Sequence, residues 1–169
     1  LPLVGTEEVN IKFADTNEEE ISVKLYVNKV TPAYEDAERS LISIGLVSEE
    51  YIKNELGGSK LNIRFDGKIS DHIDKILKKF LKTEKDVDIE ETSNNYNFIG
   101  NGRKPFYTLN WLSKSSVPSK DGKKGDTSGF FLYETADGFK FKSIDALFAQ
   151  EKKKSFIYND SPDSKGSVP

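Results

Sequence analysis

The sequence predicts an α+β fold, in which an antiparallel β unit is followed by a small domain of helices and a β-hairpin. Apolar and polar side chains alternate in three runs between residues 9 and 47, as in strands with one buried face. Apolar residues between 73 and 81 recur instead at helical spacing. Because the strands precede the helices and do not alternate with them, a regular βαβ sheet is not expected.

Three strands are expected in the amino-terminal part of the chain. The first covers residues 9–13, where Val9, Ile11 and Phe13 share a face that we expect to be buried, and a solvated acidic turn follows at residues 15–20. The second covers residues 21–28, and we expect Thr31-Pro32 to stop it because proline disrupts strand pairing. The third covers residues 40–47 and places three apolar side chains on one face, those of Ile42, Ile44 and Leu46.

Two helices follow these strands. Ser48 is placed to cap a short helix that ends near Asn54, with acidic residues in its first turn where the helix dipole favours them. Gly57-Gly58 then ends this unit and marks a domain boundary. The spacing predicts a second helix over residues 70–82, capped by Ser70 or Asp71, and its apolar face comprises Ile73, Ile76, Leu77, Phe80 and Leu81.

The carboxyl-terminal half is expected to hold a short strand at residues 87–91 and a helix at residues 106–116. Pro105 suits the first turn of that helix, since its missing N–H has no helical partner there, and Val117-Pro118 closes it. After a polar connection, residues 130–135 and 139–142 form a hairpin about an Asp137-Gly138 turn. Ser143 starts a short helix, residues 155–158 form a last strand, and residues 161–169 resemble a linker.

The composition excludes several classes of function. The 25 Lys and Arg residues against 28 Asp and Glu give a net charge of -3 with no long basic block, which argues against a dedicated nucleic-acid binder. The absence of cysteine removes disulfides, thiol nucleophiles and thiolate zinc sites. No apolar run reaches the length of a membrane helix, and the first residues lack a signal-peptide pattern. The sequence has no methionine, so we expect it to be a segment of a longer protein.

Catalytic chemistry has little support in the residue pattern. His72 is the only histidine, which rules out a histidine triad or a multi-histidine metal site within one chain, and we expect it on the polar flank of its helix. A pair of carboxylates could cleave a glycosidic bond, and the candidates are Glu90, Glu91, Glu134, Asp137 and Asp145. None of them has a surrounding pattern that would tune its pKa, so no catalytic, cofactor-binding or metal-binding residue is assigned.

Two basic segments have a possible ligand. Gly100 to Gly102 precede a helix and are followed by Arg103 and Lys104, an arrangement that could bind phosphate. A sharp turn before Pro105 explains the same glycines, and neither nucleotide-binding fingerprint is complete. Lys152 to Lys154 are either a solvated surface or a weak, sequence-independent contact for DNA.

Aromatic residues carry the greatest potential for binding. They cluster on the predicted hairpin and the helix after it, where one face is expected to be buried and the other to contact a protein. The set comprises Phe130, Tyr133, Phe139, Phe141 and Phe148.

Six segments in this order and spacing resemble the baseplate hub protein of contractile-tailed, T-even-type bacteriophages. They are VGTEEVNIKF, VKLYVNKVTP, SLISIGLVSEEYIKN, RFDGKISDHIDKILKKFL, NFIGNGRKPFYTLNWLSKSSVPS and GFFLYETADGFKFKSIDALF. The resemblance implies that residues 1–58 are part of a tube-like β domain and that residues 59–160 are an α+β domain inserted after it.

The resemblance also implies a function. Members of this family form a homotrimeric ring, an adaptor between the tail tube protein and the cell-puncturing spike protein, with DNA passing through without specific contacts. The chain would then be a structural protein without cofactors, made in the host cytoplasm and located in the virion. One alternative is a small glycan-cleaving enzyme of the same injection machinery, which would use two of the carboxylates named above. A second alternative is a binding module of a larger cellular secretion device.

Overall fold

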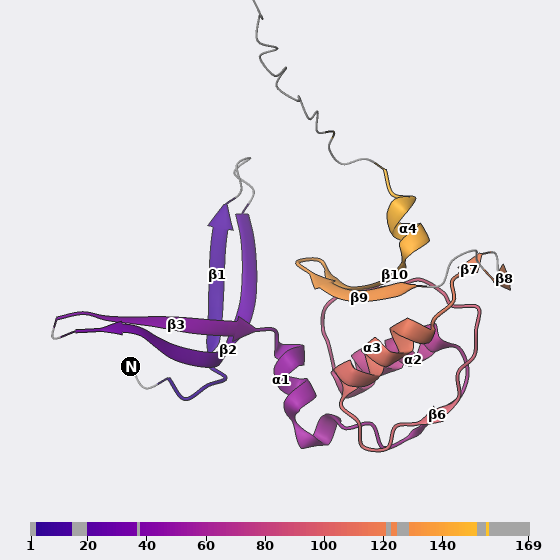
Figure 1. Ribbon diagram of the computed structural model, residues 1–169, viewed down its shortest axis with the longest axis horizontal. Helices are drawn as coiled ribbons and strands as arrows, with labels where there is room; N and C mark the ends of the chain where they lie inside the picture. Colours follow the sequence, from indigo (N-terminus) through magenta and orange to yellow (C-terminus); the bar gives the residue numbers. More distant parts are fainter. Residues whose placement is uncertain are drawn as a thin grey trace, which may run out of the picture.

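The computed structural model describes residues 3–14, 20–36, 38–120, 123–124, 129–151 and 155. It has a mixed α+β fold with helices α1 to α4 and mainly antiparallel sheets, which confirms the predicted class. Figure 1 shows two long β ribbons at the amino-terminal end and, joined to them by α1, a body of helices beside a small sheet. Four predicted features lie wholly or largely outside the described residues: the acidic turn after residue 14, the basic run at 152–154, the strand at 155–158 and the tail at 161–169.

The amino-terminal sheet consists of two ribbons that share one strand. Strand β1 (Glu8–Ala14) pairs antiparallel with the first half of β2 (Glu20–Glu35), and β3 (Ser40–Val47) pairs with its second half. Tyr26 is the one β2 residue in both registers, opposite Glu8 on one side and Val47 on the other. The two ribbons therefore follow one another along β2, and Figure 1 shows the chain changing direction where they meet.

The predicted end of the second strand at Thr31-Pro32 is wrong, because β2 continues to Glu35. Proline is tolerated at sheet edges and at bulges. Here β3 pairs with only one side of this half of β2, and the register shifts between Pro32 and Tyr34.

The predicted burial of the strand faces is also wrong for much of both ribbons. Phe13 is 50% exposed and Ile42 is 45% exposed, although both lie on the apolar side of their strands. Alternation predicted the strands correctly, but the described chain covers this side only near the join of the ribbons, where Val27 is buried.

The helices of the body form close to where the spacing predicts. Helix α1 (Glu49–Glu55) follows Ser48 at its N-cap, but the Ser48 side chain makes no capping hydrogen bond, and a 3-10 turn η1 (Gly57–Ser59) follows. Helix α2 (Ile69–Lys75) continues as a π-helical segment η2 (Ile76–Phe80). Its N-cap is Lys68 and not Ser70 or Asp71, because Thr92 from a distant segment accepts the Ser70 backbone N–H at 3.0 Å.

The remaining elements frame the body. Helix α3 (Pro105–Ser115) starts with proline, as predicted. Strands β5 (Val87–Ile89), β10 (Gly138–Ser143) and β9 (Phe130–Thr135) form a sheet in the order β5-β10-β9, with β5 parallel to β10. Two short pairs, β4 (Arg64–Phe65) with β6 (Phe98–Ile99) and β7 (Ser119–Lys120) with β8 (Lys123–Lys124), complete the strands.

The hairpin turn lies one residue earlier than predicted. Gly138 pairs with Thr135, so the turn residues are Ala136 and Asp137. Gly138 has a φ of +127°, and a Cβ there would collide with the backbone carbonyl of Asp86. The glycine therefore permits close approach of the neighbouring chain, and the short helix α4 (Ile144–Phe148) follows with Ser143 as its predicted cap.

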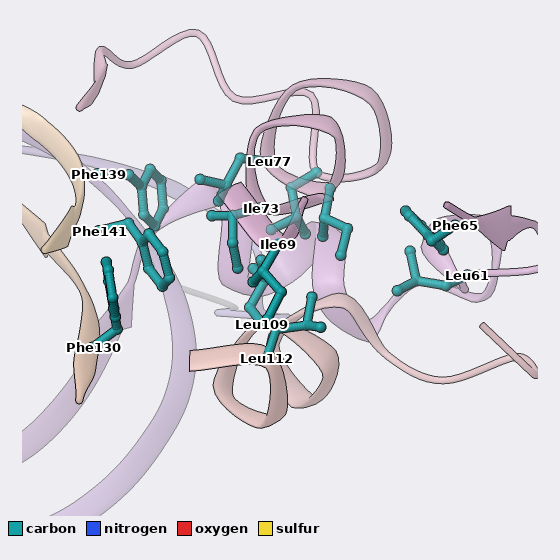
Figure 2. Close-up of a cluster of buried hydrophobic side chains, with 12 residues drawn as sticks. Leu61, Phe65, Ile69, Ile73, Leu77, Leu109, Leu112, Phe130, Phe139 and Phe141 are labelled. Atoms are coloured by element: carbon teal, nitrogen blue, oxygen red, sulfur yellow. The ribbon is translucent and has the colours of Figure 1, made fainter. Parts of the chain in front are cut away.

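The hydrophobic core lies between α2 with η2, α3 and the inner face of the sheet (Figure 2). The apolar stripe predicted for the second helix contributes Ile73, Ile76 and Leu77, all fully buried. Phe130 and Phe141 stack within the hairpin with their ring centroids 4.5 Å apart, and both belong to the same buried cluster as the helix residues. Within the part of the chain that the structure describes, no helix combines the length and apolar character needed to cross a bilayer.

Candidate interaction surface

One side of the two ribbons is apolar along both of them. Residues opposite one another in neighbouring strands project to the same side of a sheet, so the register assigns the side chains. We call this side the ribbon face; it comprises Val9, Ile11, Phe13, Ile21, Val23, Leu25, Val27, Val30, Ile42, Ile44 and Leu46.

A bulge keeps the ribbon face continuous where the two ribbons meet. Strict alternation would place Val27 and Val30 on opposite sides of β2. The register shift between Val27 and Lys29 adds one residue to β2. The Val30–Ile44 pair therefore lies on the same side of the sheet as the Val27–Leu46 pair. The apolar side chains therefore form one surface, and several of them are 36% to 50% exposed. The exposed residues lie on either side of the join, where Val27 itself is buried. Exposed apolar areas of this kind are typical of sites of protein association.

The strand edges of the ribbons add backbone groups to this surface. In the described residues, no strand pairs with the outer edge of β1 or of β3. Strand β3 has the sequence SLISIGLV, without charge or proline. Natural proteins protect free edges with charges, proline or a covering element, so an edge like that of β3 is suited to pairing with another strand.

The second ribbon, formed by β3 and the second half of β2, is an arm whose tip is held by one carboxylate. Oδ1 of Asp36 accepts the backbone N–H groups of Glu38 and Arg39 at 2.8 and 2.9 Å, and Oδ2 accepts the Tyr34 hydroxyl at 2.7 Å. The bond from the Glu38 N–H, then those from Tyr34 and Arg39, hold the pKa of Asp36 below its usual value. One side chain thus links Tyr34, Glu38 and Arg39 near the end of the arm.

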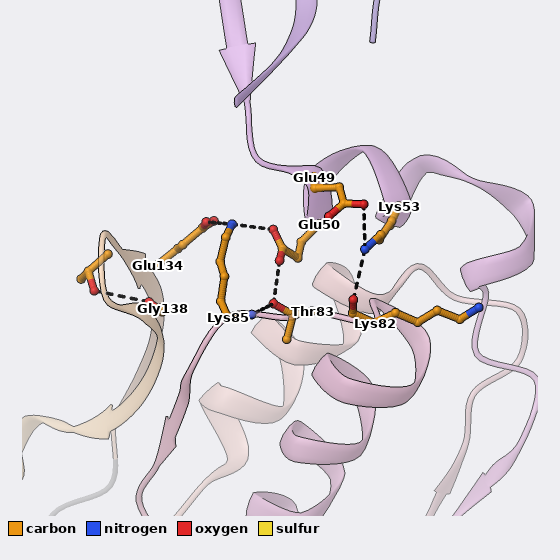
Figure 3. A network of polar contacts seen from close by, with 9 residues as sticks. Glu49, Glu50, Lys53, Lys82, Thr83, Lys85, Glu134 and Gly138 are labelled. Atoms are coloured by element: carbon orange, nitrogen blue, oxygen red, sulfur yellow. Dashed lines mark hydrogen bonds and ion pairs between the residues drawn. The ribbon is translucent and has the colours of Figure 1, made fainter. Parts of the chain in front are cut away.

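Helix α1 anchors the ribbons to the body through an ionic network (Figure 3). The Glu50 side chain is 2% exposed and accepts hydrogen bonds from Lys85 Nζ at 2.7 Å and from Thr83 Oγ1 at 2.6 Å. Lys85 also bonds to Glu134 on β9, so one lysine joins α1 to the hairpin. Burial raises the pKa of Glu50, but the bonds from Lys85 and Thr83 outweigh it and leave that pKa lowered.

Further polar contacts hold α1 in place. The Asn54 side chain accepts the backbone N–H of Phe106 at 2.8 Å, which satisfies one free donor at the start of α3. Lys53 Nζ donates to the Lys82 carbonyl at 3.1 Å, and Lys104 pairs with Glu55. The orientation of the ribbons is therefore set by side chains that the sequence does not distinguish from its other charges.

The candidate carboxylates are mostly engaged by cations or by backbone. Glu134 pairs with Lys85, Glu91 pairs with Lys68, and Asp137 lies exposed at the hairpin turn. Glu90 and Asp145 line one cavity of about 310 Å³, but both oxygens of Glu90 accept from Ser143, at 2.7 Å from its N–H and 2.8 Å from its hydroxyl. Among the described residues, no group of three or more metal-ligating side chains is placed to hold an ion.

The Gly100 to Gly102 loop is a tight turn whose backbone donors are occupied. The N–H groups of Gly100, Gly102 and Arg103 donate to carbonyls at 2.9 to 3.0 Å, so they do not form an open phosphate cradle. Gly102 has a φ of +68°, and a Cβ on Gly100 would collide with the backbone of Leu61. Arg103 lies over the rings of Tyr107 and Trp111, 5.4 and 5.5 Å from their centroids.

The predicted position of His72 on a polar flank is wrong. The side chain is buried, its Nε2 donates to the Tyr96 carbonyl at 2.8 Å, and its ring packs edge-on against Phe65 and Phe98. This hydrogen bond supplies the polar partner that a buried imidazole needs.

The aromatic set divides between the core and the surface. Phe130, Phe139 and Phe141 are buried, Tyr133 is partly buried, and Phe148 at the end of α4 is 86% exposed. The residue pattern does not single out Glu50, Thr83 and Lys85, because they lie in separate segments without any shared motif. The uncharged run of β3 is the one local pattern that could have indicated a free edge.

No protein-family model matches the chain, and a search of curated proteins finds no significant match.

Proposed function

We propose that this chain is a structural component of a phage tail baseplate hub, a homotrimeric ring adaptor between the tail tube and the cell-puncturing spike, without catalytic activity. The ribbon face and the free edges beside it are the observation that supports this most directly. An isolated two-stranded ribbon is at best marginally stable in water, and in the described part of the chain each ribbon has only two strands over most of its length. Such ribbons need further strands from the same protein or from a neighbouring subunit.

A tube-like β domain would provide those strands. In a ring, each subunit offers one edge and one face to the next, so that an open edge on one side is covered by its neighbour. The uncharged edge of β3 suits this pairing because no charge has to be desolvated. In this proposal the protein is made in the host cytoplasm, functions in the virion, and contacts DNA only as the DNA passes through the ring.

The proposal can be tested by the oligomeric state of the protein expressed from its complete reading frame. We expect a trimer by light scattering, and we expect Ile44→Glu to convert it to a folded monomer because a charge would lie on the ribbon face. Ser43→Glu is the matched control, since Ser43 is the adjacent residue on the other side of β3. A monomeric parent at high concentration, or a trimer that tolerates Ile44→Glu, would contradict the proposal.

A glycan-cleaving enzyme has one observation in its favour, the cavity that Glu90 and Asp145 share. Two carboxylates near one cavity are the minimum that such chemistry requires. The two bonds from Ser143 nevertheless occupy Glu90 in a structural role at the start of α4. We expect no release of soluble fragments from peptidoglycan; release that Glu90→Gln abolishes would favour the enzyme instead.

A further inference from the structure

A groove lies between helix α3 and strand β9, apart from the ribbon face. It has a volume of about 430 Å³. One wall is a single face of α3, formed by Phe106, Asn110 and Ser113 at spacings of four and three residues. The opposite wall is β9, and Phe130 and Phe139 contribute apolar surface from the sheet.

Among the described residues, strand β9 is the edge strand of its sheet, and the hydrogen-bond pattern shows which backbone groups face outward. Phe139 N–H donates to the Asp86 carbonyl at 2.8 Å, and the Phe141 carbonyl accepts from Glu90 N–H at 2.9 Å. The backbone groups of these two β10 residues therefore point toward the segment that contains β5. Glu134 and Leu132 are the residues opposite them across the hairpin, and the backbone groups of these two residues point the other way, toward the open edge.

The outward row therefore contains the backbone groups of Phe130, Leu132 and Glu134, and these three residues also line the groove. Residues two apart in a strand repeat about every 7 Å. Another extended chain matches a row of donors and acceptors with that repeat. Because α3 stands beside this edge, the side chains of an added strand would enter the space between the helix and the sheet.

Carboxylates outnumber cations in the ionic network beside the groove. Glu134 and the buried Glu50 share the single cation of Lys85. The network thus carries one more negative charge than positive charge at neutral pH, at the end of the groove where β9 approaches its turn. A cationic side chain placed there would balance this excess.

We propose that this groove binds an extended peptide segment of a partner protein by strand addition to the edge of β9. The bound segment carries apolar side chains at alternating positions, which pack against Phe106 and Phe130, and a lysine or arginine beside Glu134. Backbone pairing supplies affinity, and the apolar and cationic positions supply specificity. The site is separate from the ribbon face and does not depend on the function proposed above.

A labelled peptide tests the proposal on the unmodified protein. The probe is a fluorescein-labelled peptide of about eight residues, in which Val and Phe alternate with Ser and Thr beside one terminal Lys. We expect saturable binding by fluorescence anisotropy. N-methylation of the alternate amides that face β9 should weaken it at least about tenfold, whereas methylation of the other amides should change it less than about twofold.

Matched variants locate the site on the protein. Asn110→Trp fills the groove from an exposed position on α3 and should weaken binding by about tenfold, while Lys114→Trp, one turn further along the helix and outside the groove, should not. Glu134→Gln should weaken the binding of the lysine-bearing peptide by about two- to fivefold. It should not change the binding of a peptide that has Gln in place of Lys.

Three results would overturn the proposal. They are binding that is insensitive to N-methylation, binding that survives Asn110→Trp, and no saturation by the unmodified protein at millimolar peptide. Self-association that Asn110→Trp abolishes would assign the groove to a second copy of this chain and would overturn the assignment to a different partner.

Discussion

The ionic network between α1 and the hairpin makes a strong prediction about Lys85. Lys85→Met keeps most of the aliphatic length of the side chain but removes the cation that serves both Glu50 and Glu134. Glu50 then remains buried, and Thr83 is the one side-chain hydrogen-bond donor left to it among the residues that the structure describes. The loss of charge compensation, and not the loss of packing, is the perturbation.

The expected cost follows from the burial of Glu50. Leaving a buried charge without its partner destabilises proteins by about 3 to 5 kcal/mol. Thr83 still satisfies one oxygen of Glu50, and the Lys85 side chain is 34% exposed, so the ion pair that is lost is only half buried. We therefore expect the free energy of unfolding to fall by about 2 to 3 kcal/mol, below the range for a fully buried pair.

Urea unfolding followed by circular dichroism provides the measurement. The midpoint of Lys85→Met should fall by about 1 M at pH 7. The difference from the unmodified protein should shrink near pH 5, because burial without Lys85 raises the pKa of Glu50 and permits it to become neutral. Lys78→Met is the control, since its exposed pair with Asp74 is worth about 0.5 kcal/mol at most.

The reasoning would be refuted if Lys85→Met lowered the free energy of unfolding by no more than Lys78→Met does. A cost of Lys85→Met that is the same at pH 7 and at pH 5 would refute it too. The double variant Lys85→Met with Glu50→Gln should be less destabilised than the sum of the two single variants, because no uncompensated charge remains buried.

Three further predictions concern the core, a turn and the response to acid. Phe141→Ala should lower the free energy of unfolding by about 3 to 5 kcal/mol, since its side chain is fully buried, and Phe131→Ala on the exposed side of the hairpin should lower it by less than about 1 kcal/mol by the same urea assay. Gly100→Ala should lower the melting temperature strongly because its Cβ would strike the facing backbone, whereas Gly57→Ala has open space and should be nearly neutral. The lowered pKa of Glu50 means that its contribution to stability is present above the unfolded pKa and is lost as the pH falls through the folded pKa. Glu50→Gln should therefore lose less stability than the unmodified protein on acidification from about pH 5 to about pH 3, and an equal loss would contradict this assignment.

Several features of the fold could be predicted because they are local. The third strand was predicted with its observed bounds, since alternation and its flanking residues act over a few positions. Helix α3 starts at Pro105 and α4 is capped by Ser143, both through local backbone chemistry.

The features that the sequence did not reveal depend on distant segments. The two-residue spacing of Ile42 and Ile44 shows that they share a side, but not whether another layer covers that side. The candidate interaction surface could be predicted only in part for this reason. Its strands were expected, whereas the join of the two ribbons at Tyr26 and the exposure of their apolar side were not.

Taken alone, the sequence determined the class of the fold, the type of most elements and the apolar stripe of the second helix. Tertiary structure alone decided that β2 passes through Pro32, that His72 is buried, and that Glu50 and Glu134 share Lys85. The physical reason is the range of the interactions involved. Periodicity and capping are properties of neighbouring residues, whereas burial, edge position and ion pairing depend on what lies opposite a residue once the chain has folded.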